Sequence, residues 1–156
     1  YIISGELFSF YTHILILGII ILCTTSFSSL MFLIYLFVKT SSTIGGLTAF
    51  TSSVGGFLAG IYISIGGLSG LTKDIISSNP LAHATALVRG VLMSSQIETI
   101  FKGVPAENVK GFSDGMGLNL YAGTFQFTNL HYVIGLFAVA VICFTISYFK
   151  LKNDKM

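Results

Sequence analysis

The stretch "NPLAHATALVRG", residues 79–90, decides how this chain is organised. Asparagine is a good helix cap and proline suits the first helical position, so Pro80 is predicted to begin a new helix that runs to about residue 101. Apolar residues recur along it at helical spacing, whereas Thr85 and Arg89 lie on a polar stripe. Such an amphipathic helix is typical of a membrane interface or a protein-lined cavity, with Arg89 at the level of the lipid headgroups.

On both sides of this stretch the chain is apolar. Of its 156 residues, 53% are hydrophobic and 9% are charged, and the mean hydropathy is +0.86; a globular domain carries roughly a quarter charged residues. Three runs without any acidic residue, Lys or Arg each exceed the roughly 20 residues that a membrane span needs. We therefore predict an all-α integral membrane protein, a single transmembrane domain with three transmembrane helices. The spans are placed at about 11–38, 40–65 and 129–149, with an external region at 66–128.

The positive charges set the expected orientation. Three lysines, Lys150, Lys152 and Lys155, follow the last span, and short segments rich in Lys and Arg stay in the cytoplasm. The C-terminus is therefore predicted to be cytoplasmic. Counting back places Lys39 inside and residues 66–128 outside, in a multi-pass protein of a cell membrane, which we expect to be bacterial.

Two patterns within the spans leave alternatives open. The first span carries a hydroxyl cluster, which indicates either a helix-packing seam or a hydroxyl-lined substrate path. Its members are Thr24, Thr25, Ser26, Ser28 and Ser29. In the second span Gly56 and Gly60 have GxxxG spacing, which favours either packing within the chain or a dimer face.

The sequence lacks the motifs of several classes of nucleotide-binding, metal-binding and catalytic sites. The sequence has no GxxxxGK[ST] phosphate loop and no HExxH, CxxC or GxSxG motif, so no catalytic or metal-binding residue is predicted and the chain is not expected to be an enzyme. Cys23 and Cys143 lie in apolar runs and are interpreted as small hydrophobic residues. His83 is interpreted as a capping or surface residue. A net charge of +2 without clustering argues against binding nucleic acid.

The order of elements resembles a known family. Two spans, then "GFLAGIYISIGGLSGLTKDIISSNPLAHATALVRGVL" (56–92), an external loop, a last span and a basic tail are similar to the C-terminal half of an ABC transporter type-2 permease. The resemblance covers the chain from about residue 11 to its end. The matching motif residues are Gly60, Ile61, Tyr62, Asn79, Pro80, His83 and Arg89. Two features depart from the family: Ser64 stands where many members have proline, and the first three helices, the N-terminal amphipathic helix and the coupling helix have no counterpart.

This resemblance implies a type-2 ABC exporter-like fold with an external re-entrant, amphipathic helical hairpin, and a chain that is a C-terminal fragment of a six-helix permease. It implies as partners a second permease subunit, identical or different, membrane lipids, and an ATP-binding cassette subunit that holds ATP and Mg, so that this chain carries no cofactor. Multidrug, antimicrobial peptide or lipid-linked glycan export is the expected activity. The gating candidates are Gly56, Gly60, Tyr62, Asn79, Pro80, His83 and Arg89.

Two questions stay open after the resemblance. Arg89 is either a structural anchor, with Asp74 or Glu98 as its ion-pair candidates, or a substrate contact, and no substrate-binding residue is assigned. The alternative function is a non-transporting small membrane anchor, immunity or assembly protein, in which three helices form a bundle.

Overall fold

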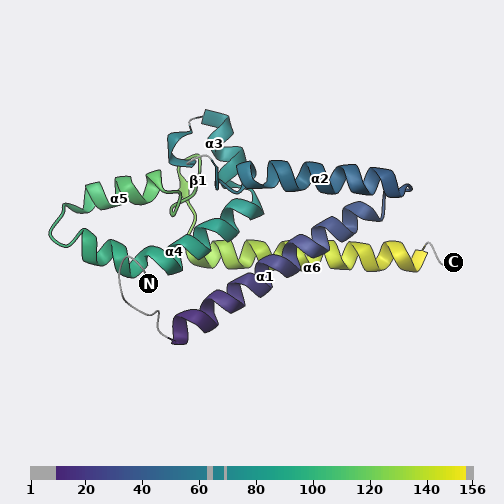
Figure 1. Ribbon diagram of the computed structural model, residues 1–156, viewed down its shortest axis with the longest axis horizontal. Coiled ribbons are helices and arrows are strands. Elements are labelled where there is room, and N and C mark those ends of the chain that lie inside the picture. Colours follow the sequence, from purple (N-terminus) through teal and green to yellow (C-terminus); the bar gives the residue numbers. More distant parts are fainter. Residues whose placement is uncertain (1–9, 63–64, 69, 154–156) are drawn as a thin grey trace.

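The computed structural model describes residues 10–62, 65–68 and 70–153, most of which are helical (Figure 1). The elements in chain order are α1 (Phe10–Tyr35), α2 (Ser41–Leu58), the 3₁₀ turn η1 (Ile65–Gly67), α3 (Gly70–Ser77), α4 (Pro80–Ile100), α5 (Ala106–Gly115), β1 (Tyr121–Ala122), β2 (Phe125–Gln126) and α6 (Asn129–Asn153). Strands β1 and β2 form a small antiparallel hairpin.

Helices α1 and α6 pack together and run in the same direction (Figure 1). At their first turns Tyr11 and Asn129 line one shared hollow. At the other end the Lys150 Nζ lies 4.2 Å from the centroid of the Phe37 ring. We call this second end, with Lys39, Lys150 and Lys152, the basic end. Helix α2 returns from the basic end in the opposite direction.

Small residues line the contact between α1 and α6. Ser26 and Ser29 are buried on α1, and Ala140, Cys143 and Ser147 are buried on α6 at three- and four-residue spacing. Small side chains let two helix backbones approach closely, which drives helix association in lipid. The Ser26 hydroxyl donates a hydrogen bond across the contact to the carbonyl of Leu136 at 2.7 Å. These residues form what we call the α1–α6 seam.

Two helices, α1 and α6, are long and apolar enough to cross a membrane. They contain 26 and 25 residues, and the mean hydropathy of their most apolar windows is 2.3 and 2.2. Only 17% and 28% of the residues in those windows are buried. The 18-residue helix α2 is not among the helices that reach this measure. Two of the three predicted spans are thus confirmed as helices of spanning character, and the third stays a prediction.

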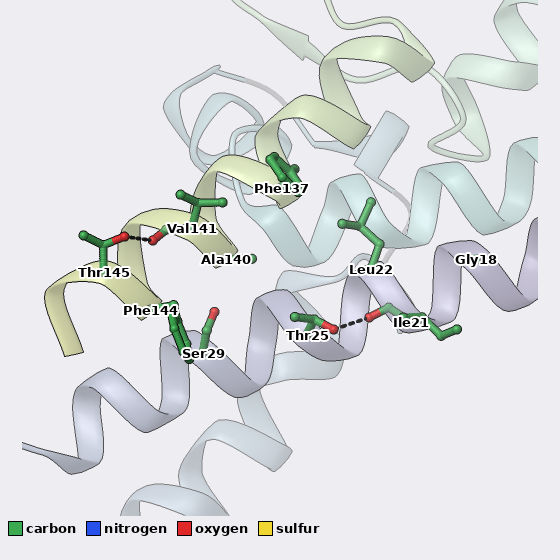
Figure 2. Close-up of a pocket in the computed structure, with 10 residues that line it drawn as sticks. All are labelled: Gly18, Ile21, Leu22, Thr25, Ser29, Phe137, Ala140, Val141, Phe144 and Thr145. Atoms are coloured by element: carbon green, nitrogen blue, oxygen red, sulfur yellow. Dashed lines mark hydrogen bonds between the residues drawn. The ribbon is translucent and has the colours of Figure 1, made fainter. Parts of the chain in front are cut away.

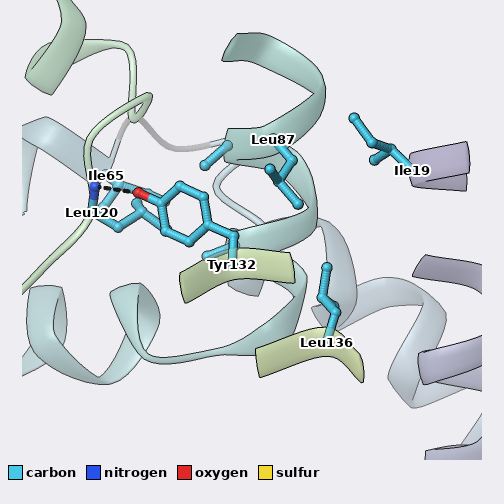
Figure 3. Close-up of a cluster of buried hydrophobic side chains, with 8 residues drawn as sticks. Ile19, Ile65, Leu87, Leu120, Tyr132 and Leu136 are labelled. Carbon is cyan, nitrogen blue, oxygen red and sulfur yellow. Dashed lines mark hydrogen bonds between the residues drawn. The ribbon is translucent and has the colours of Figure 1, made fainter. Parts of the chain in front are cut away.

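The described residues of 65–128 form a lobe at the end opposite the basic end (Figure 1). The first half of α4 packs against both α1 and α6 and joins this lobe to them. Figure 3 shows the buried cluster at the junction, in which the Tyr132 hydroxyl of α6 accepts a hydrogen bond from the Leu120 backbone N–H at 3.0 Å. The cluster consists of Ile19, Ile65, Ala82, Ala86, Leu87, Leu120, Tyr132 and Leu136.

Some element bounds differ from the sequence-based expectation. Helix α4 begins and ends as predicted, whereas the helix expected over 40–65 ends at Leu58. The cause is Gly60, whose φ of 68° is a left-handed conformation that terminates helices. Helices α3 and α5 were not predicted, because their glycines lower helix propensity.

Candidate functional site

The motif residues of 79–90 build the start of α4. Asn79 has an extended backbone, with φ −77° and ψ 133°, and its Oδ1 accepts a hydrogen bond from the Leu81 N–H at 2.9 Å. Pro80 is the first residue of the helix, where its missing N–H leaves no hydrogen bond unmade. The predicted cap and first residue of this helix are both confirmed.

His83 is buried rather than exposed, which corrects the expectation of a capping or surface residue. Its Nε2 lies 2.9 Å from the Ser77 carbonyl oxygen. A carbonyl can only accept, so Nε2 carries the hydrogen. The imidazole packs at centroid distances of 5.1 Å from the rings of Phe127 and Tyr132. Burial lowers the pKa of His83, so the ring is neutral and binds the end of α3 to α4.

Arg89 joins three helices. One guanidinium nitrogen donates to the Gly60 carbonyl and the other to the Met116 carbonyl, each at 2.8 Å. Gly60 follows the end of α2, and Met116 is the C-terminal cap of α5. Carbonyls at helix C-termini carry partial negative charge, and a cation there is stabilising.

The carboxylates of Asp74 and Glu98 are not the partners of Arg89, contrary to the ion pair suggested from the sequence. Asp74 instead accepts a hydrogen bond from the Gly123 N–H at 3.0 Å, which ties α3 to the β1–β2 hairpin. Arg89 therefore acts as an anchor by donating hydrogen bonds to two backbone carbonyls, and it does not pair with the carboxylate of Asp74 or Glu98.

Gly56 and Gly60 do not form one helix face. A Cβ on Gly56 would overlap the ring of Tyr62, which folds back over the last turn of α2. The Tyr62 ring also lies 5.1 Å from the Phe57 ring. Gly60 lies past the end of the helix, in the left-handed conformation. The spacing thus reflects two local requirements, room for Tyr62 and a helix stop.

Arg89 also borders an open pocket of about 330 Å³ between α1, α4 and Ile61, which lies three residues past the end of α2. Its other walls are mostly apolar, and its one hydroxyl on α4, that of Thr85, donates to the Leu81 carbonyl of the same helix. We call this the Arg89 pocket. It is lined by Ile20, Cys23, Thr24, Ile61, Ala84, Thr85, Val88 and Arg89.

A second hollow, of about 470 Å³, lies between α1 and α6, and Figure 2 shows the residues around it. Thr25 and Thr145 reach it from the two helices, but their hydroxyls donate to the carbonyls of Ile21 and Val141 at 2.7 Å. Ser29 also lines this hollow, with its hydroxyl donating to the Ser26 carbonyl, and the remaining walls, including Phe137, are apolar. The hydroxyl cluster of α1 thus has two parts: some members lie in the α1–α6 seam and others border open hollows.

A polar cluster around Asp114 and Tyr121 in the lobe was missed by sequence reasoning. Tyr121 donates a hydrogen bond to Asp114 at 3.0 Å, and Asn119 donates to the same carboxylate at 2.7 Å. Burial, with the hydrogen bond and the negative charge of Asp114, raises the pKa of Tyr121 to about 12. The Lys73 Nζ lies 5.4 Å from the centroid of the Tyr121 ring. Lys73 is far from Asp114, Asn119 and Tyr121 in the sequence, and the four residues form no recognisable motif, so the sequence does not predict this cluster.

Within residues 10–62, 65–68 and 70–153, no three His, Cys, Asp or Glu side chains lie close enough together to hold a metal ion. The motif residues Asn79, Pro80, His83 and Arg89 are all brought to the junction of the lobe with the long helices. No family model, curated protein or solved structure matches this chain.

Proposed function

We propose that this chain is a membrane-spanning permease subunit of an ATP-driven type-2 ABC exporter. In this proposal α1, α2 and α6 cross the membrane, the basic end lies in the cytoplasm, and the 65–128 lobe lies outside. A separate ATP-binding subunit supplies the energy, and a second permease subunit completes the transport pathway.

The uncovered apolar surface of α1 and α6 supports a location in lipid. Large side chains such as Phe137, Phe144 and Leu17 are 61%, 66% and 58% exposed. Soluble monomers rarely expose contiguous apolar patches beyond a few hundred Å². Lysine over an aromatic ring at the basic end, as Lys150 lies over Phe37, is typical of a membrane interface, where the ammonium reaches water and the ring stays near the headgroups.

The observation that carries the exporter proposal is the convergence of the family-motif residues on one junction. Asn79 caps α4, His83 binds the end of α3, and Arg89 binds the ends of α2 and α5. Asn79, His83 and Arg89 thus each have a defined structural task at the place where the lobe meets the long helices.

The same junction suggests how motion reaches the lobe. Helix α2 has no buried residue among those described, whereas α1 and α6 share a close seam. A tilt of α2 relative to that pair would pull on the Gly60 carbonyl and, through Arg89, on α4 and α5. We propose that this linkage opens and closes the outer mouth of the pathway during alternating access.

The test is purification of the native complex in mild detergent, followed by reconstitution into nanodiscs. We expect an ATP-binding cassette protein to co-purify in fixed stoichiometry with this chain, and the complex to hydrolyse ATP. Arg89→Lys keeps the charge but loses the two-pronged donor geometry, so ATP hydrolysis coupled to transport should fall. Lys110→Arg on exposed α5 is the matched control and should leave it unchanged.

Purification of the chain without any ATP-hydrolysing partner would contradict the proposal. That outcome would favour the alternative of a non-transporting membrane anchor, immunity or assembly protein.

A further inference from the structure

The Arg89 pocket combines one cation with an apolar wall. Within the described residues the Arg89 guanidinium has two carbonyl partners and no carboxylate partner. Both partners are neutral backbone groups, so the full positive charge of the side chain remains. A guanidinium has five N–H donors, and two of them are used here, which leaves three for a further acceptor.

The pocket extends away from this charge along hydrophobic side chains. From Arg89, beside the end of α2, it reaches Ile20 and Cys23 in the middle of α1. Val88 and Ala84 form the α4 side. The Thr85 hydroxyl is already used within its own helix, so this side offers little to a polar ligand. Its volume of about 330 Å³ lies at the lower end of the range for small-molecule sites.

The direction of the pocket matches that of a lipid in the membrane. Gly60, the α2-side partner of Arg89, follows the end of α2 that lies on the lobe side, whereas Cys23 lies well within the apolar helix α1. A headgroup at the guanidinium would therefore be at the membrane surface, and an attached chain would extend into the hydrocarbon region.

We propose that the Arg89 pocket binds an anionic amphiphile of the outer leaflet, with its phosphate or carboxylate on the free donors of Arg89 and an alkyl chain between α1 and α4. The inference rests on the membrane placement given under the proposed function, and it adds a ligand class to it. Arg89 then has two tasks, since the same guanidinium anchors α2 and α5 and faces the ligand.

The chain contains no tryptophan, so an introduced one is a unique fluorescence probe within it. Ile61→Trp places the indole at the rim of the pocket, at a side chain that is 61% exposed. Phe50→Trp, at a site on α2 that is 64% exposed and outside the pocket, is the matched control. The protein is placed in nanodiscs with bromine-labelled acyl chains on either phosphatidylglycerol or phosphatidylcholine.

We expect bromine on phosphatidylglycerol to quench the residue-61 indole more than the same bromine on phosphatidylcholine, with a roughly five-fold enrichment of the anionic lipid at this position. The residue-50 indole should show no such preference. Soluble glycerol phosphate should not reduce the quenching, because it lacks the chain; competition by it would mean that the pocket binds the anion alone, and would overturn the proposal.

Two further variants separate binding from folding. Arg89→Gln should abolish the preference, and Ala84→Leu should reduce it by filling the pocket while leaving both Arg89 hydrogen bonds in place. Equal quenching by both lipids in the otherwise unmodified protein would overturn the proposal. The assay needs only membrane insertion, so it gives an answer whether or not an ATP-binding partner is found.

Discussion

Helix α2 and the α1–α6 pair are held in opposite ways. In the pair, Ser26 and Leu136 join the two backbones by a hydrogen bond, and small residues allow close contact along the seam. Helix α2 has no buried residue among those described. Thr48, near the middle of α2, shares a hydrogen bond with the Tyr35 hydroxyl at the end of α1, and the Gly60 carbonyl following α2 accepts one from Arg89.

This difference shows that small residues alone do not decide whether two helices associate. Gly45, Gly46 and Gly55 on α2 have open space where a Cβ would be, so these small residues meet no neighbour within the chain. The seam residues of α6 meet α1 at spacings that keep them on one face. We therefore expect the α1–α6 pair to be the fixed part of the molecule and the position of α2 to depend on its bond to Arg89.

The largest expected effect is the release of α2 by Arg89→Ala. The variant removes two charge-assisted hydrogen bonds, each worth roughly 1.5–3 kcal/mol. Because the bond to Met116 is exposed and the bond to Gly60 is only partly buried, we expect a combined loss below that sum, roughly 2–4 kcal/mol in the free energy of unfolding. Spin labels at Phe50 on α2 and Val141 on α6 should report a broader distance distribution. Thermal unfolding in detergent measures the stability.

Lys110→Ala is the control for this experiment, because Lys110 lies exposed on α5. It should change neither the stability nor the distance. If Arg89→Ala and Lys110→Ala gave the same result, Arg89 would not be the link that holds α2.

The second prediction concerns the seam. Ser26 is fully buried, so Ser26→Leu forces extra volume between α1 and α6 and loses the bond to Leu136; we expect a destabilisation of about 2 kcal/mol. Ser28→Leu, on the exposed side of α1, should cost less than about 0.5 kcal/mol. Detergent unfolding of the two variants is compared. Equal effects would mean that the seam is not packed as described.

A smaller effect is expected within α2 itself. Gly55→Ala has open space and should stabilise the helix by roughly 0.5–1 kcal/mol through helix propensity. Gly56→Ala has the same propensity gain but must displace the Tyr62 ring, so its net effect should be near zero. Combining Gly56→Ala with Tyr62→Ala should restore the gain. Helical content and melting temperature are measured for each variant. If Gly55→Ala and Gly56→Ala had the same effect, the Tyr62 ring would not pack against Gly56.

The smallest effect is a pH dependence confined to the lobe. The fold raises the pKa of Tyr121 to about 12 by burial and by Asp114, so it favours the neutral phenol. The resulting contribution of Tyr121 to the stability of the fold is fully present below pH about 10, the pKa of tyrosine in the unfolded chain. It is lost as the pH rises through about 12, the pKa in the fold. The absorbance difference between the protein and Tyr121→Phe follows this titration, without overlap from tryptophan.

Asp114→Asn should move that titration toward pH 10. An unchanged titration would show that Asp114 does not interact with Tyr121. The α1–α6 seam has no part in this cluster, so its unfolding should not follow the same pH dependence.

Parts of this arrangement could be read from the sequence for clear physical reasons. The long uncharged runs predicted α1 and α6, and Asn79-Pro80 predicted the start of α4, because these patterns depend only on residues close together in the sequence. Helices α3 and α5 contain glycines that weaken local propensity, and contacts with η1 and the β1–β2 hairpin favour them instead. Local patterns carry no record of such contacts.

The partners of Arg89 could not be predicted for a related reason. They are backbone carbonyls 29 and 27 residues away, and every residue has a carbonyl, so no side-chain pattern marks them. The burial of His83 depends on Phe127, which follows β2, and on Tyr132 of α6, both of which are distant from His83 in the sequence. The sequence pattern identified Arg89 and His83 as candidate residues, but the environment predicted for His83 was wrong.

The central claim, that the lobe and the basic end lie on opposite sides of a membrane, has one direct measurement. Single cysteines at Lys110→Cys and Asn153→Cys, in a chain with Cys23→Ala and Cys143→Ala, are labelled in intact cells with a membrane-impermeant maleimide. We predict that residue 110 reacts in intact cells and that residue 153 reacts only after the membrane is opened. Labelling of both residues from the same side would contradict the account.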